Sequence, residues 1–89
     1  MKVVITILGK DRIGIVARVS TTLSEHSVNI VDINQNIVND IFNMIMIADM
    51  ERAAISLQDL QELLKEQGEA MGLEIRVQHE DIFKIMHRI

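Results

Sequence analysis

Two hydrophobic periodicities alternate along this chain, and their order constrains the fold more than any single motif does. Strand-like patterns occupy residues 3–8, 29–39, 41–49 and 73–79, and helical spacing occupies about 13–25 and 57–71. The first strand, VVITIL, is apolar throughout, as in a strand buried within a sheet. The strand IFNMIMIAD at 41–49 is apolar on both faces, so its second face needs burial or a partner.

The resulting order β-α-β-β-α-β predicts one α+β domain in these 89 residues. Right-handed crossovers leave few topologies, and the expected one is a ferredoxin-like sandwich with a four-stranded antiparallel sheet and both helices on one face. Asn39 and Asp40 predict the hairpin turn between the middle strands, because both residues tolerate left-handed backbone conformations. The 81–89 tail predicts a short C-terminal helix, which must pack on its own domain or on another subunit.

Local signals place the ends of the helices. Asp11 is the predicted N-cap of the first helix, which we expect to start at Ile13 with that side chain in the core. Ser56 followed by Asp59 at the third helical position resembles a capping box for the second helix.

Two glycines belong to the second helical stretch. Gly68 lies inside it and is expected to weaken the helix, whereas Gly72 is a natural terminator.

Composition excludes several classes of function. The net charge of −4 argues against a nucleic-acid surface, and two aromatic residues, Phe42 and Phe83, provide no base-stacking platform. The absence of cysteine excludes disulfides, thiolate nucleophiles and zinc–thiolate sites. The N-terminus does not resemble a signal peptide, and no apolar run approaches the length of a membrane span. We expect a soluble cytoplasmic protein without a cofactor.

Catalytic or metal-binding constellations are not evident. His79, Glu80 and Asp81 could form a metal site with His87 if the tail folded back, but solvated polar side chains are the favoured interpretation. The serines and threonines at 20–22 have no general base evident beside them. The prediction is therefore a protein that is not an enzyme, with no catalytic and no metal-ligating residues.

One enzymatic alternative shares the predicted fold. Acylphosphatases bind phosphate in the loop after the first strand, using backbone amides and an arginine, and an asparagine on a later strand positions the attacking water. Arg12 and Asn43 stand in corresponding places, but the longer glycine- and arginine-containing cradle is missing. We keep this hydrolase as a remote alternative.

The loop GKDRIG, Gly9 to Gly14, is the strongest candidate for a binding site. The amides and the dipole of a helix N-terminus attract anions, and Gly14 lets a ligand approach closely. Asp11 could accept hydrogen bonds from an ammonium group, so the loop suits an amino acid. The structural alternative is that Asp11 caps the helix, Gly9 turns the chain and Gly14 permits close packing.

The stretch GKDRIGIVARVSTTLSEHSVNI resembles the opening motif of ACT domains: a strand, a D/N-R-P-G-like turn, a helix, and an Asn-Ile pair that opens the second strand. The similarity covers essentially the whole chain and implies a single ACT domain at 1–89. The tail QHEDIFKIMHRI further resembles small stand-alone bacterial and archaeal ACT proteins of uncharacterised function.

The resemblance implies a function and a site. ACT domains commonly regulate by binding amino acids or other small metabolites between paired domains. It implies a ligand-binding set formed by the loop residues Gly9, Asp11, Arg12 and Gly14 of one subunit and Asn29 of its neighbour. Among these, Asp11 stands where some serine-binding members have asparagine and Gly9 where they have histidine; a further departure is Ile13, which replaces the usual proline.

We therefore expect a sensor of an amino acid or similar metabolite that works as a homodimer, with a tetramer left open. The alternative is a ligand-free interaction module acting on a separate protein partner. Its contact surface would be the side of the third strand that carries Phe42, Met44 and Met46, together with Phe83 and Met86 of the tail.

Overall fold

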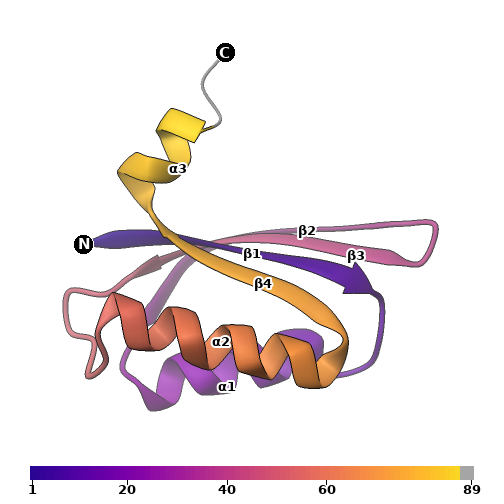
Figure 1. Cartoon of the computed structure of the whole chain (residues 1–89), viewed down its shortest axis with the longest axis horizontal. Coiled ribbons are helices and arrows are strands. Elements are labelled where there is room, and N and C mark those ends of the chain that lie inside the picture. Colours follow the sequence, from indigo (N-terminus) through magenta and orange to yellow (C-terminus); the bar gives the residue numbers. More distant parts are fainter. Residues whose placement is uncertain (87–89) are drawn as a thin grey trace.

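The computed structural model describes residues 1–86 and has the predicted order of elements (Figure 1). In chain order the elements are β1 (Lys2–Lys10), α1 (Ile15–Glu25), β2 (Asn29–Val38), β3 (Ile41–Asp49), α2 (Leu57–Met71), β4 (Leu73–His79) and α3 (Glu80–Met86). The strands form one antiparallel sheet in the order β2-β3-β1-β4. Helices α1 and α2 cover one face of the sheet, and α3 rises from the other side. The predicted α+β ferredoxin-like fold is confirmed.

None of the helices within residues 1–86 is long and apolar enough to cross a membrane.

The hydrophobic core lies between the sheet and the two long helices. Alternate strand residues fill it, among them Val3, Ile5, Ile7, Phe42, Met44, Met46, Leu73, Ile75 and Val77, against Ile15, Val19, Leu23, Leu60, Leu64 and Met71 from the helices. The suggestion that Phe42, Met44 and Met46 form a partner surface is therefore wrong, because these side chains are almost fully buried. Strict alternation along β3 instead turns Ile41, Ile45 and Ile47 to the opposite face.

That opposite face, which α1 and α2 leave uncovered, is called the open face below. Directly paired residues of neighbouring strands share a face of the sheet. Leu8 of β1 therefore lies on the open face beside Asn43 of β3, and Val38 of β2 lies on it beside Ile41 of β3. Leu8, Val38 and Ile41 are each about half exposed. The second apolar side of β3 therefore stays largely uncovered within one chain.

Helix α1 starts later than predicted. Its N-cap is Gly14, whose φ of 91° lies in the left-handed region, and no side chain bonds to this cap in the described chain. Asp11 does not cap the helix, and Ile13 is fully exposed rather than in the core. The reason is that the chain turns at Gly14, which leaves Ile13 outside the helix and makes Ile15 its first buried residue.

Helix α2 begins and ends as predicted. The amide of Asp59 donates to Ser56 Oγ at 3.1 Å, and Gly72 adopts a left-handed conformation as C-cap. Gly68 has a role that the pattern did not indicate. A Cβ at this position would lie 2.8 Å from Ile75 Cγ1 and 2.9 Å from the Leu73 carbonyl oxygen, so the glycine lets α2 approach β4 closely.

The β2–β3 hairpin turns at Asn39 and Asp40, whose φ angles of 50° and 66° confirm the predicted turn. In Figure 1 the hairpin extends past the ends of α1 and α2. Strand β2 is consequently exposed along most of its length and forms one edge of the sheet. An irregularity in its register lies between Ile30 and Asp32.

Candidate functional site

The loop between β1 and α1 is held at two points. The amide of Asp11 donates to the Asp40 carbonyl oxygen at 2.8 Å, and Arg12 Nη1 donates to the Met71 carbonyl oxygen at 3.1 Å. The first bond joins the loop to the hairpin turn, and the second joins it to the last residue of α2. A guanidinium at a helix C-terminus also faces the negative end of the helix dipole. The loop is therefore fixed by its neighbours.

The N-terminus of α1 remains open for a ligand. Its first turn carries no acidic residue, and no side chain caps it within residues 1–86. Gly14 is exposed, and a Cβ at this position would meet nothing within 4 Å. The first amides of a helix have no partner inside the helix, so here they can receive an anion. The carboxylate of Asp11 is exposed nearby and makes no hydrogen bond or ion pair with the described residues.

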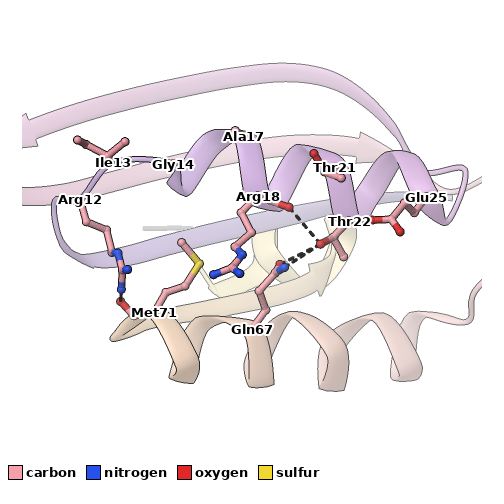
Figure 2. A pocket seen from close by; sticks show the side chains of 10 residues that line it. All are labelled: Arg12, Ile13, Gly14, Ala17, Arg18, Thr21, Thr22, Glu25, Gln67 and Met71. Carbon is pink, nitrogen blue, oxygen red and sulfur yellow. Dashed lines mark hydrogen bonds between the residues drawn. The ribbon is translucent and has the colours of Figure 1, made fainter.

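Behind the loop, a groove of about 470 Å³ runs between α1 and α2 (Figure 2). Arg12, Gly14, Arg18 and Met71 line it. Gln67 Nε2 donates to Thr22 Oγ1 at 2.8 Å across the groove, and Thr22 Oγ1 donates back to the Arg18 carbonyl oxygen at 3.1 Å. The first bond joins the two helices and the second lies within α1, and together they satisfy the half-hidden polar groups between the helices.

Gly9 lies inside β1 and does not turn the chain, so the alternative in which it makes a turn is wrong. A Cβ at Gly9 would lie 2.6 Å from Leu73 Cδ2 and 3.0 Å from the Gly72 carbonyl oxygen. The glycine is needed because the turn from α2 into β4, at Gly72 and Leu73, packs directly against β1 here. A larger side chain, such as the histidine that the family resemblance suggested for this position, has no room.

Asn29 lies at the other end of the domain. It opens β2 opposite Asp49, whereas Gly9 pairs with Phe42 at the far end of β3. Those two partners are seven residue steps apart along β3, which is about 23 Å at 3.3 Å per residue. One chain therefore brings Gly9, Asp11, Arg12 and Gly14 together but not Asn29.

The two alternative sites are not assembled. Arg12 lies at the end of α2 on the helical side of the sheet, whereas Asn43 lies on the open face, so the pair required for acylphosphatase chemistry is separated. No group of three or more histidine, cysteine or acidic residues that could hold a metal occurs among the described residues. His79 Nδ1 instead accepts from the Asp81 amide at 3.1 Å, and His87 lies outside the described part of the chain.

Comparison with known proteins gives consistent matches over the whole chain. The family model for the ACT domain matches residues 2–78. A UPF0237 protein of Methanosarcina acetivorans is 46% identical over 86 residues, which cover 97% of this chain and 94% of the relative. A UPF0237 protein of Clostridium acetobutylicum is 42% identical over 89 residues, the full length of both. Among solved structures, an ACT domain protein from Streptococcus pneumoniae superposes with a TM-score of 0.82 at 32% identity, covering 94% of each chain. The chain thus belongs to the ACT-domain family, in the group of small UPF0237 proteins that archaea and bacteria share.

Proposed function

We propose that this protein is a regulatory ACT module that binds a small zwitterion, with an amino acid as the leading class, at the contact between two subunits. The carrying observation is the N-terminus of α1, which no side chain of residues 1–86 caps, beside the Asp11 carboxylate, which has no partner among the same residues. A ligand carboxylate at the helix amides would be stabilised by the helix dipole, and Asp11 would receive the ammonium group. The amides at the start of α1 thus match the carboxylate of an amino acid, and Asp11 matches its ammonium group.

The second half of the site comes from a neighbouring subunit. Strand β2 is an exposed edge whose backbone can pair with another strand. Antiparallel pairing of two β2 strands about a twofold axis perpendicular to the sheet reverses one domain relative to the other. The end that carries Asn29 then meets the end that carries Asp11 and Gly14, although about 23 Å separate these ends in one chain. The fully exposed Ile13 lies at this same end, and the neighbouring subunit would bury part of its side chain.

Thermal shift of the purified protein with the common amino acids tests this function. A ligand at a hundred times its dissociation constant adds about 2.7 kcal/mol of stability, and each kcal/mol moves the midpoint of a domain this small by roughly 4–8 °C. We expect Asn29→Ala to abolish the shift. Asn43→Ala is the matched control, since it removes an exposed asparagine from the open face, and it should keep the shift. A flat screen over all amino acids would contradict the proposal.

Subunit complementation tests the shared site directly. Asp11→Ala and Asn29→Ala should each lose binding alone, because each variant lacks one half of both sites in a dimer. After the two are unfolded together and refolded, a mixed dimer contains one site with both residues. About a quarter of the wild-type binding capacity should return, since half of the dimers are mixed and each holds one intact site of two. A site formed within one chain would regain nothing.

A further inference from the structure

The open face carries several exposed apolar side chains at and near its hairpin end. Val38 and Ile41 pair directly, and Ile45 lies on the same face of β3 beyond Asn43. Their exposed fractions are 55%, 51% and 41%. Leu8 on the adjacent β1 adds to this surface from the next strand. Neighbouring apolar side chains that stay exposed together mark a contact surface rather than an ordinary part of the exterior.

Helix α3 stands at the opposite end of the same face. It follows β4 directly, and Figure 1 shows it rising away from the sheet on the side opposite α1 and α2. Phe83 lines a hollow on the open face together with Thr6, Leu8 and Ile45, so it lies beside part of the apolar surface of its own sheet, whereas Val38 and Ile41 lie outside this hollow. Ile82 and Ile85 point elsewhere and are 53% and 70% exposed. A helix of seven residues gains little stability of its own, so contacts that cover these isoleucines would add to the hold that Phe83 gives it on its own sheet.

We propose that a second copy of this chain covers the open face, with α3 of each subunit lying on the hairpin end of its partner's sheet. The twofold axis runs parallel to the sheets and perpendicular to the strands. Such an axis places the α3 end of one subunit over the hairpin end of the other. The same twofold rotation therefore covers the hairpin-end surface and the exposed isoleucines of α3 in both subunits. The two α3 helices then lie between the two sheets at opposite ends of the contact, with Ile82 and Ile85 of each against the partner's Val38 and Ile41.

The charges along the open face agree with this direction of stacking. Helix α3 begins with Glu80, which pairs with Lys84 of the same helix at 3.2 Å, and Asp81, whose side chain is 78% exposed. At the hairpin end, Lys10 pairs with Ile41 and is exposed, with no ion pair to the described residues. The proposed axis brings the partner's acidic helix start to this lysine. A parallel stacking would instead place the two acidic starts together.

The contact is independent of the ligand site. It uses the open face, whereas the proposed ligand site uses the β2 edge and the start of α1. The twofold axis of β2 pairing is perpendicular to the sheet, and the stacking axis lies parallel to it. Two perpendicular twofold axes generate a tetramer with dihedral symmetry, so both contacts can form in one assembly. Loss of the stacking contact would leave the β2-paired dimer and its ligand sites intact.

The molar mass from sedimentation equilibrium tests the proposal. Ile85→Asp places a charge on a side chain that is 70% exposed in the single chain, so the fold should persist, as checked by circular dichroism. We expect the mass of this variant to be half that of the wild type at equal concentration. Gln58→Asp, which adds the same charge at an exposed position of α2, should keep the wild-type mass. A monomeric wild type, or an Ile85→Asp variant of unchanged mass, would overturn the proposal.

Cross-linking gives a second test that does not depend on disrupting the assembly. The chain has no cysteine, so introduced thiols are the sole targets of a short bismaleimide. Ile41→Cys mixed with Ile85→Cys should give covalent dimers in much higher yield than either variant alone. Equal yields in the mixture and in the two single-variant samples would show that α3 does not reach the partner's hairpin end.

Discussion

Arg12 Nη1 lies 3.1 Å from the carbonyl oxygen of Met71, a residue 59 positions later in the chain. This hydrogen bond joins the candidate ligand loop to the last residue of α2. Through Gly72, α2 leads directly into β4, which continues into α3. The loop that faces the proposed ligand is therefore bonded to the end of the helix that precedes β4 and α3 in the chain.

Replacement of Arg12 measures how much this hydrogen bond contributes to the free energy of unfolding. We expect Arg12→Ala to lower the free energy of unfolding by about 1 kcal/mol, from one lost hydrogen bond and a lost charge at the helix C-terminus. Urea unfolding at fixed protein concentration gives the value. Arg18→Ala removes an exposed arginine from the same groove and should change stability by less than about 0.5 kcal/mol. Equal effects of the two substitutions would mean that the Met71 bond contributes nothing.

Gly68 offers a prediction in which two effects oppose each other. Alanine is favoured over glycine inside a helix by about 1 kcal/mol. Here the added Cβ would lie 2.8 Å from Ile75 Cγ1 and 2.9 Å from the Leu73 carbonyl oxygen, and the second contact is to backbone that cannot rotate away. Overpacking costs typically 1–3 kcal/mol, so it should win. We expect Gly68→Ala to lower the thermal midpoint.

The control for this substitution is Ala70→Gly, at an exposed position of the same helix. It should cost about 1 kcal/mol from helix propensity alone. If Gly68→Ala raised the midpoint instead, β4 would have to move away from α2 at no cost, and the close approach would not contribute to stability.

A substitution in the β2–β3 hairpin turn should make the protein more stable. Asp40 has a φ of 66°, a region that glycine adopts more readily than aspartate, and Asn-Gly is the preferred pair for a turn with two left-handed residues. Asp40→Gly should raise the free energy of unfolding by about 0.5–1 kcal/mol, because the bond from the Asp11 amide uses the backbone carbonyl and survives. Asp40→Val should lower stability, since a β-branched residue fits this conformation poorly. Thermal midpoints of the two variants check the opposite signs.

Much of the fold follows from local patterns in the sequence. Alternation in residues 73–79 fixes both the strand and its buried side, and Ser56 with Asp59 fixes the start of α2. The start of α1 was misplaced because Ile13 and Ile15 both fit a helical spacing with later apolar residues. The choice between them depends on the left-handed φ of Gly14, which spacing does not reveal.

The site was predictable only in part, for a topological reason. The pattern singled out the loop, but its fixed position depends on Asp40 and Met71, which are close only because the β1 end, the hairpin turn and the end of α2 meet at one edge of the domain. The element order could have suggested that meeting, but not the bonding atoms. Asn29 lies at the opposite edge, so the role proposed for it would need a second chain, which sequence patterns do not describe.

Substitutions at Gly14 should affect the stability of the protein and the binding of the proposed ligand differently. A Cβ there would meet nothing within 4 Å, so the cost of Gly14→Ala comes from the backbone at φ 91°, about 1–2 kcal/mol. Gly14→Asn should cost less, because asparagine tolerates positive φ better than alanine. If a ligand carboxylate binds at the first turn of α1, the asparagine side chain should block its close approach. We therefore expect Gly14→Asn to be the more stable of the two variants and yet to lose the ligand-induced thermal shift. Retention of that shift would place the ligand away from the start of α1.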